Sequence, residues 1–402
     1  MPGPLAGIRV LDLTRVLAGP WAAQNLADLG AEVIKVERPN KGDDSRAFGP
    51  PWLKDAAGGD TTDSAYFACA NRAKKSITVD LANPKGQAII RELAARCDVL
   101  LENFKFGDLD RYGLGYAQLK TVNPALIYCS LTGFGHSGPW RERPGYDFMV
   151  QGMGGLMSIT GERDDRPGGG PQKAGIPIAD LITGMYASVA VCAALAHRAK
   201  SGKGQHLDLA LFDSLVAVLA NQGANYLATG EPPGRLGNDH PNIAPYQVFR
   251  TKDGSLILAC GNDNLFRKFC EVAGCTSLPD DARFATNGKR VANRVELTRI
   301  LSDIFLKKTT REWIEALEAA GVPSGPINDL KQVFEEPQAV ARGLRMQIGN
   351  VSLVRSPMRF SETPIEHQAP PPLLGEHTDE VLRGLLGKSE GEVARLRSEG
   401  IV

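Results

Sequence analysis

Short strand-like runs and helix-like runs alternate along the first third of the chain, and this order restricts the possible folds more than any other feature. Residues 7–13 (GIRVLDL) form a β-type run, residues 20–29 have helical character, and residues 31–37 (AEVIKVE) form a second β-type run. Pro20 stands at the start of the helical segment, where its missing N–H costs nothing. The three segments predict a β-α-β unit.

The same order continues beyond this unit. Residues 76–81 (SITVDL) read as a strand, a helix begins at Asn83–Pro84, and residues 98–104 (DVLLENF) read as the next strand. The run GYAQLKTV is helical, and ALIYCSLTGFG is a strand that enters a glycine-containing loop. Such alternation predicts a mostly parallel sheet with helices on both faces, which is a Rossmann-like α/β domain.

The pattern changes after about residue 205, which indicates a second domain. HLDLALFDSLVAVLANQGANYLATG reads as one long connecting helix, and residues 246–260 read as a hairpin around the turn Lys252–Asp253–Gly254. Helical stretches follow at 263–274, 291–307 and 310–320. Pro-containing segments at 323–329 and 366–377 read as loops or linkers. We expect a large domain at residues 1–205 and a connecting helix at 206–228. A small α+β domain should follow at 229–325, and residues 326–402 should form a linker and return to the large domain.

Composition excludes several classes of partner. Lysine plus arginine total 46 and aspartate plus glutamate total 46, so no net charge attracts nucleic acid or an anionic membrane. The seven cysteines form no CxxC pair, which predicts reduced thiols and a cytoplasmic location. The six histidines show no metal-ligand spacing, so we expect no metal site.

Asp180 is an unusual residue because a long apolar run follows it, in AGIPIADLITGMYASVAVCAALAH. The run is shorter than the ~20 residues that a membrane span needs, so we expect a buried helix and no membrane. Aspartate is a common helix N-cap, and capping is the ordinary explanation for Asp180. A nucleophilic carboxylate is the alternative.

Arg38 is a candidate nucleotide ligand at the end of the second strand, in KVERP. In a doubly wound sheet that strand end lies near the ribose of a bound nucleotide, where arginine can pair with a ribose phosphate such as the 3′-phosphate of coenzyme A. A surface pair with Glu37 explains Arg38 equally well. The first turn reads TRVLAGPWA and lacks GxGxxG, which argues against a nicotinamide dehydrogenase.

Long blocks of the chain resemble the family III CoA-transferases, which include formyl-CoA and carnitine CoA-transferases and the related α-methylacyl-CoA racemases. The blocks run from the first strand to the C-terminal region: DLTRVLAGPWAAQNLADLGAEVIKVERP, NRAKKSITVDL, DVLLENF, GYDFMVQGMGGLMSITG, IADLITGMYA, HPNIAPYQVFRTKDG, GVPSGPIND and PPPLLGEHT. The resemblance implies a homodimer of interlocked rings, with acyl-CoA and a small carboxylic acid as substrates and no prosthetic group.

The resemblance also implies that Asp180 is the nucleophile. Its carboxylate would attack an acyl-CoA thioester, giving a mixed anhydride and then an aspartyl-CoA thioester. Residues that match the CoA-binding positions of the family stand at four places along the chain: Arg15 and Val16, Arg38, Lys74 and Lys75, and Asn103, Phe104 and Arg111. Leu17 replaces a glutamine of formyl-CoA transferase, which argues against formyl or oxalyl substrates.

Blocks such as LTRVLAGPW, ERPNKGDDSRAFGPP and EEPQ look most like the branch that exchanges CoA between succinyl-CoA and glutarate. This likeness implies a dicarboxylate acceptor, whose second carboxylate needs a cation. Arg15 and Arg46 are candidates, with surface pairing as the alternative for each, and His240 is either a site residue or a loop cap.

Two other functions stay open at this point. A racemase needs an acid–base histidine where this chain has Tyr146, beside an Asp147 that we interpret as structural. A CoA-binding protein without catalysis would have little use for Asp180 in its full motif. Gly168–Gly170 is either an active-site loop or a plain surface turn.

Overall fold

The computed structural model describes residues 3–55, 57–365 and 369–402. The chain divides into two compact units. Unit 1 comprises Met1–Gly155, Ala174–Leu219 and Gln338–Val402, and unit 2 comprises Leu156–Lys173 and Ala220–Pro337. Each unit has its own hydrophobic core. Part of the predicted loop 366–377, residues 366–368, lies outside the described residues.

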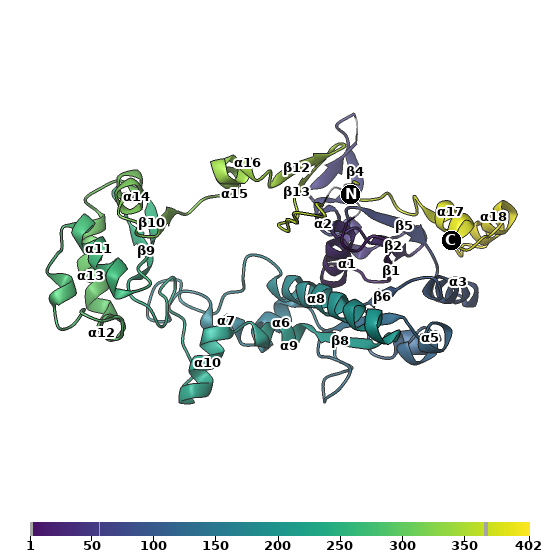
Figure 1. Ribbon diagram of the computed structural model, residues 1–402, viewed down its shortest axis with the longest axis horizontal. Helices are drawn as coiled ribbons and strands as arrows, with labels where there is room; N and C mark the ends of the chain where they lie inside the picture. The colour runs from purple at the N-terminus through teal and green to yellow at the C-terminus, as the bar shows by residue number, and fades with distance from the viewer. Residues whose placement is uncertain (1–2, 56, 366–368) are drawn as a thin grey trace. The chain divides into compact units, whose positions relative to one another are not determined.

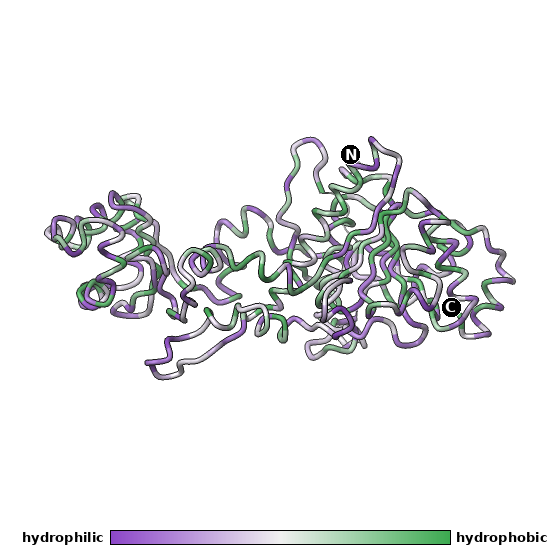
Figure 2. The backbone as a smooth tube through the Cα atoms, turned by 90° about the horizontal axis from the view of Figure 1, so that it is seen from below, coloured by the Kyte–Doolittle hydropathy of each residue, from purple (hydrophilic) through white to green (hydrophobic). Residues whose placement is uncertain are grey.

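Unit 1 is built on a six-stranded parallel sheet in the order β5-β2-β1-β6-β7-β8 (Figure 1). The strands are β1 (Arg9–Asp12), β2 (Glu32–Glu37), β5 (Lys74–Thr78), β6 (Val99–Glu102), β7 (Ile127–Thr132) and β8 (His206–Ala210). Apolar side chains cover both faces, as expected for a parallel sheet. Figure 2 shows hydrophobic stretches gathered in the interior of this unit. The predicted parallel α/β domain is confirmed.

Helices pack on both faces of this sheet. One core contains α1 (Ala18–Asp28) and α8 (Ile178–Ser201), and the other contains α3 (Pro84–Ala94), α5 (Tyr116–Val122) and α18 (Glu390–Ser398). Smaller elements complete the unit: β3 (Trp52–Lys54), β4 (Asp60–Ser64), α2 (Ala65–Cys69), α4 (Asp108–Arg111), α6 (Asp147–Met153), α9 (Leu211–Ala217), β12 (Arg345–Ile348), β13 (Val351–Val354) and α17 (Thr378–Glu380).

The long helix α8 packs one face against α1 (Figure 1). Gly184 permits the close approach, because a Cβ there would lie 2.6 Å from the carbonyl oxygen of Ala18. The opposite face leaves Met185 and Val189 exposed, so the prediction of a buried helix holds for one face only. Among the described residues α8 alone is long and apolar enough to cross a membrane, a test that core helices also pass.

The predicted connecting helix at 206–228 is wrong. His206–Ala210 alternates in polarity with the period of a strand and pairs with β7 as the sheet edge β8. Two helices follow, α9 and then α10 (Ala220–Thr229). Ala220 has a φ of +47°, a left-handed value that ends helical continuity, and the two units divide immediately before it.

Unit 2 is a small α+β unit around an antiparallel sheet in the order β11-β10-β9. Its strands are β9 (Tyr246–Arg250), β10 (Ser255–Ala259) and β11 (Ser324–Pro326), so the predicted hairpin is confirmed and part of the predicted loop 323–329 is instead a strand. The loop prediction was wrong because pairing with β10, a distant contact, defines β11. The helices are α7 (Leu156–Ile159), α10, α11 (Asp263–Ala273), α12 (Asn287–Ala292), α13 (Arg294–Phe305), α14 (Thr310–Ala319) and α15 (Leu330–Glu335), and α16 (Pro337–Ala341) spans the boundary.

Candidate active site

The sheet topology predicts where unit 1 binds a ligand. Strand order reverses between β1 and β6, and open α/β sheets bind ligands beyond the carboxyl ends of the strands at such a point. A cavity of about 260 Å³ lies there. The loops that follow β1, β6 and β7 line it, with Arg15–Ala18, Asn103–Phe106 and Leu131–Gly133. The rest of the wall comes from Asp44, Asp108, the segment 141–147, Asp180 and Leu211.

Asp180 lies in the first turn of α8, at the third helical residue. Its carboxylate has no hydrogen bond or ion pair among the described residues. Burial, and after it the negative charge of Asp147, raises the pKa of Asp180 to about 7. Tyr66 on α2 is near enough that, after burial, the charge of Asp180 raises the pKa of its phenol. The site therefore contains a partly desolvated, unpaired carboxylate.

The ordinary explanation of Asp180 as a helix N-cap is wrong. Pro177 occupies the N-cap position, and its side chain makes no capping hydrogen bond. Asp147, the first residue of α6, caps the helix instead: its Oδ1 accepts hydrogen bonds from Ala179 N at 2.7 Å and Asp180 N at 3.3 Å. The Asp180 side chain is thus not committed to capping.

Asn103 fixes the backbone of Arg15 beside the cavity. Its Oδ1 accepts from Arg15 N at 3.0 Å, and its Nδ2 donates to Arg15 O at 2.8 Å. The Arg15 guanidinium lies 5.2 Å from the ring centre of Phe104, and its Nη1 is 3.4 Å from Asp44 Oδ2. The buried Nε of Arg15 has no hydrogen-bond partner. Arg15 therefore has an unused donor in this wall.

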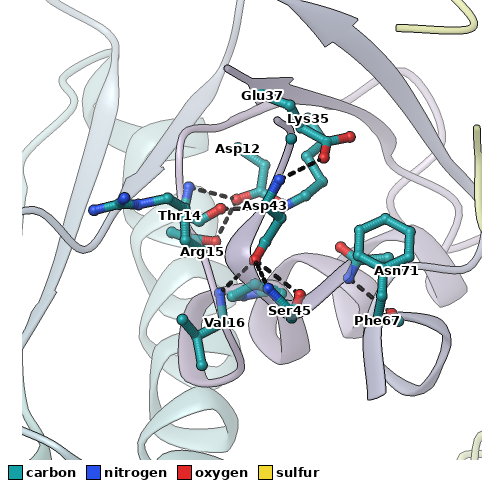
Figure 3. A network of polar contacts seen from close by, with 12 residues as sticks. Asp12, Thr14, Arg15, Val16, Lys35, Glu37, Asp43, Ser45, Phe67 and Asn71 are labelled. Atoms are coloured by element: carbon teal, nitrogen blue, oxygen red, sulfur yellow. Dashed lines mark hydrogen bonds and ion pairs between the residues drawn. The ribbon is translucent and has the colours of Figure 1, made fainter. Parts of the chain in front are cut away.

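A buried ion pair fixes the next residue of the same loop (Figure 3). Lys35 Nζ donates to Asp43 Oδ2 at 2.8 Å and to Thr14 O at 2.9 Å. Asp43 Oδ1 in turn accepts from Val16 N at 3.1 Å. Val16 has a φ of +71°, a strained conformation for a β-branched residue, which this hydrogen bond helps to hold.

The structure thus gathers Arg15, Val16, Asn103 and Phe104 around the cavity that contains Asp180. Two other predicted CoA ligands pair with carboxylates of the cavity wall. Arg38 forms an ion pair with Asp44, and the exposed Arg111 forms one with Asp108.

Lys74 and Lys75 do not reach this cavity. Successive strand residues point to opposite faces, and each lysine has a carboxylate partner on its own face. Lys74 Nζ is fully buried, 2.9 Å from Asp12 Oδ2, and Lys75 Nζ is 2.8 Å from Glu32 Oε1. Both line a different cavity of about 660 Å³ at the amino ends of β2 and β5.

Arg46 also lies outside the lining of the Asp180 cavity. Arg46 is buried and donates to Glu37 and to Asp63, at 2.7 Å and 2.8 Å, which satisfies most of its guanidinium. His240 belongs to unit 2, where its Nδ1 accepts from Asn242 N at 3.1 Å. Gly168–Gly170 also belongs to unit 2.

Several wall residues were missed by the sequence analysis. Lys105, Arg141 and Arg143 add positive charge to the cavity, and Tyr66 lies near the nucleophile candidate. Arginines next to glutamate in RERPGYD look like ordinary surface residues, so local sequence carries no signal for them. In the described part of the chain, no group of three or more His, Cys, Asp or Glu side chains is arranged to hold a metal ion.

Comparison with known proteins identifies the family. The model of CoA-transferase family III matches residues 5–378. The chain belongs to this family. It is 52% identical over 387 residues to succinate–glutarate CoA-transferase of Agrobacterium fabrum, with 95% of this chain and 96% of that protein covered. It is 44% identical to human succinyl-CoA:glutarate CoA-transferase, with 99% and 90% covered.

A solved structure agrees with this assignment. The crystal structure of a CAIB/BAIF family protein from Brucella suis has a TM-score of 0.85 and 49% sequence identity, and the match covers 96% of this chain and 100% of that chain. The family predicted from the sequence blocks is confirmed, and the protein is a family III CoA-transferase. CoA thioesters and carboxylic acids are accordingly its substrates.

Proposed function

We propose that this CoA-transferase exchanges CoA between succinyl-CoA and glutarate, with Asp180 as its nucleophile. The observation that carries the proposal is the unpaired carboxylate of Asp180 on the wall of a cavity at the sheet's switch point. The names of the relatives in Agrobacterium fabrum and humans support the substrate pair.

The chemistry starts when Asp180 attacks the thioester carbon of succinyl-CoA. A C–O bond forms, the C–S bond breaks, and CoA leaves as a thiolate while a mixed anhydride remains on Asp180. The thiolate then attacks the aspartyl carbonyl, which releases succinate and leaves an Asp180–CoA thioester. Glutarate repeats both steps in reverse, so the activation is conserved.

Arg15 is the proposed partner of the second carboxylate of the acid. Its guanidinium lines the Asp180 cavity and has a buried Nε without a hydrogen-bond partner. A dicarboxylate would have to compete only with the 3.4 Å contact between Arg15 and Asp44, whereas Arg46 would first have to leave Glu37 and Asp63. We therefore assign specificity to Arg15; Arg46 and His240 remain sequence-based predictions.

CoA binding is proposed to use Asn103, Phe104 and the loop at Val16, with Arg38 and Arg111 on the phosphates. Both arginines are paired with aspartates, so a phosphate would replace or share an existing ion pair. Lys74 and Lys75 remain candidates from the resemblance alone, since their partners are Asp12 and Glu32.

The quaternary structure is proposed to be an interlocked homodimer, as the family resemblance implies. The exposed apolar side chains Met185, Tyr186 and Val189 on α8 favour a covered helix face. Light scattering at micromolar concentration should give twice the chain mass, and an active monomer would contradict the proposal. A cytoplasmic location is likewise proposed, which the seven free cysteines favour.

The test of the function is a panel of free acids offered with succinyl-CoA. Glutarate should be the best acceptor, ahead of adipate, itaconate, formate, oxalate and carnitine, and Asp180→Ala should show no transfer. Intact mass should detect CoA on Asp180 of the parent protein and none on the variant. A preference for carnitine or formate would contradict the dicarboxylate assignment.

Pentanoate is the matched control for the second carboxylate, because it has the length of glutarate and a single acid group. Arg15→Ala should raise the KM for glutarate at least about tenfold, corresponding to about 1.4 kcal/mol of lost binding, and leave the weak use of pentanoate unchanged. An equal effect on both acids would assign Arg15 a role other than binding this carboxylate.

A further inference from the structure

Asp147, which the sequence analysis interprets as structural, contacts the helix turn that contains Asp180. We propose that Asp147 positions Asp180 and opposes its ionised form until the carboxylate is acylated, an inference that rests on the proposed function. It is a positioning residue, because its contacts are to the backbone of α8 rather than to substrate.

Both carboxylate oxygens of Asp147 are held in place. Oδ1 accepts the two N–H groups of Ala179 and Asp180, at 2.7 Å and 3.3 Å. Oδ2 accepts from Gln151 Nε2 at 2.6 Å. Gln151 is fully buried, and its Oε1 accepts from Ala174 N at 2.9 Å. This series of hydrogen bonds links α6 to the start of α8, so rotation of Asp147 away from the nucleophile would break several of them.

The same position brings a second negative charge to a desolvated carboxylate. Burial contributes most to the raised pKa of Asp180, and Asp147 contributes next. An uncharged side chain of the same length, asparagine, would offer an oxygen to the same N–H groups without this repulsion. The use of aspartate therefore keeps Asp180 more basic than a neutral cap would.

A more basic Asp180 favours formation of the covalent intermediates in the proposed reaction. Attack by Asp180 moves its negative charge onto the thiolate sulfur of CoA, so the repulsion from Asp147 disappears as the anhydride forms. The Asp180–CoA thioester is neutral at the same position. Asp147 thus favours both covalent intermediates over the free carboxylate, and basic nucleophiles attack faster than weakly basic ones.

Other titratable groups face Asp180, and the test must separate them from Asp147. Tyr66 on α2 feels the charge of Asp180, and Arg15 follows β1 in the cavity wall. The remaining charged groups of the wall come from the loops after β2, β6 and β7: Asp44, Lys105, Asp108, Arg141, Glu142 and Arg143. None of these is changed in the variants below.

The experiment compares pH profiles of kcat/KM for succinyl-CoA in Asp147→Asn, Asp147→Ser and Asp147→Glu. The two neutral variants should lower the pKa of the acidic limb by about one unit, because a like charge at short range shifts a carboxyl by that order. With a Brønsted slope of about 0.5, as for thiolates, the plateau should fall about threefold. Asp147→Glu should keep the limb of the parent protein.

Intact mass gives a second measurement, because the neutral variants should accumulate less Asp180–CoA thioester at equilibrium with succinyl-CoA. Asp213→Asn is the matched control: it removes an exposed carboxylate on α9 and should leave the limb in place. A folded neutral variant whose limb matches the parent protein overturns the inference, even if its kcat is low. If the parent protein forms no Asp180–CoA adduct and transfers no CoA, the proposed function itself fails.

Discussion

Replacing Asp180 by asparagine should make the protein more stable while abolishing transfer. The pKa of this carboxyl is raised from 3.8 to about 7 by burial and by Asp147. The folded state therefore binds the proton more tightly than the unfolded state, so stability decreases as pH rises from 3.8 to about 7. At 1.36 kcal/mol per unit, this carboxyl lowers stability by at most about 4 kcal/mol at pH 8, where it is ionised in the folded state, and by about 1.5 kcal/mol at pH 5, where folding requires it to take up a proton.

The assay is thermal and urea unfolding of parent protein and Asp180→Asn at equal concentration, at pH 5 and pH 8. The variant should be more stable at both pH values, and its advantage should grow toward pH 8. Asp213→Asn, which removes an exposed carboxylate, is the control and should show no such growth. An advantage that is absent at pH 8, or equal at the two pH values, would refute the reasoning that Asp180 is ionised at a cost.

Three further predictions concern packing, the buried ion pair and the thiols. Gly184→Ala should destabilise the protein by about 1–3 kcal/mol and lower kcat, because its Cβ would meet the backbone of α1; Gly288→Ala, with open space around it, is the control in a melting experiment. Asp43→Ala should cost about 3–5 kcal/mol at neutral pH by leaving its lysine partner unpaired. Burial alone would raise the pKa of Asp43, but the charge of Lys35 lowers it below 3.8. The stability lost in Asp43→Ala should therefore become smaller below pH 4, as urea unfolding would measure. Burial raises the pKa of Cys97 and of Cys260 to about 12, so iodoacetamide at pH 7.5 should label both slowly, as peptide mass mapping would measure.

The parallel sheet could be predicted because its evidence is local. Each strand and helix has its own periodicity, and their order along the chain implies parallel pairing. The prediction failed where pairing partners decide the outcome. Residues 206–210 become a strand by joining β7, and residues 324–326 become one by joining β10. Neither partner can be read from the segment itself.

In the candidate site too, residues that belong to a motif could be predicted, and contacts between distant segments could not. Asp180, Arg15 and Asn103 were predicted from motifs, and the structure gathers them around one cavity. The error about capping arose because the acceptor, Asp147, is more than thirty residues before the helix that it caps. The adjacent lysines 74 and 75 look equivalent in sequence, but a strand sends them to opposite faces, where different carboxylates bind them.

The division of unit 1 into three stretches of chain has a consequence for its synthesis on the ribosome. Val381, Leu382 and Val393 belong to the same hydrophobic core as Leu11 and other residues of the first strands. At about 5–20 residues per second, roughly 300 residues between β5 and this return segment take about 15–60 s to emerge. Most of unit 2 is one continuous stretch, so it can fold while the part of this core that the C-terminal segment covers is still exposed. During that interval the early sheet is a natural client for chaperones.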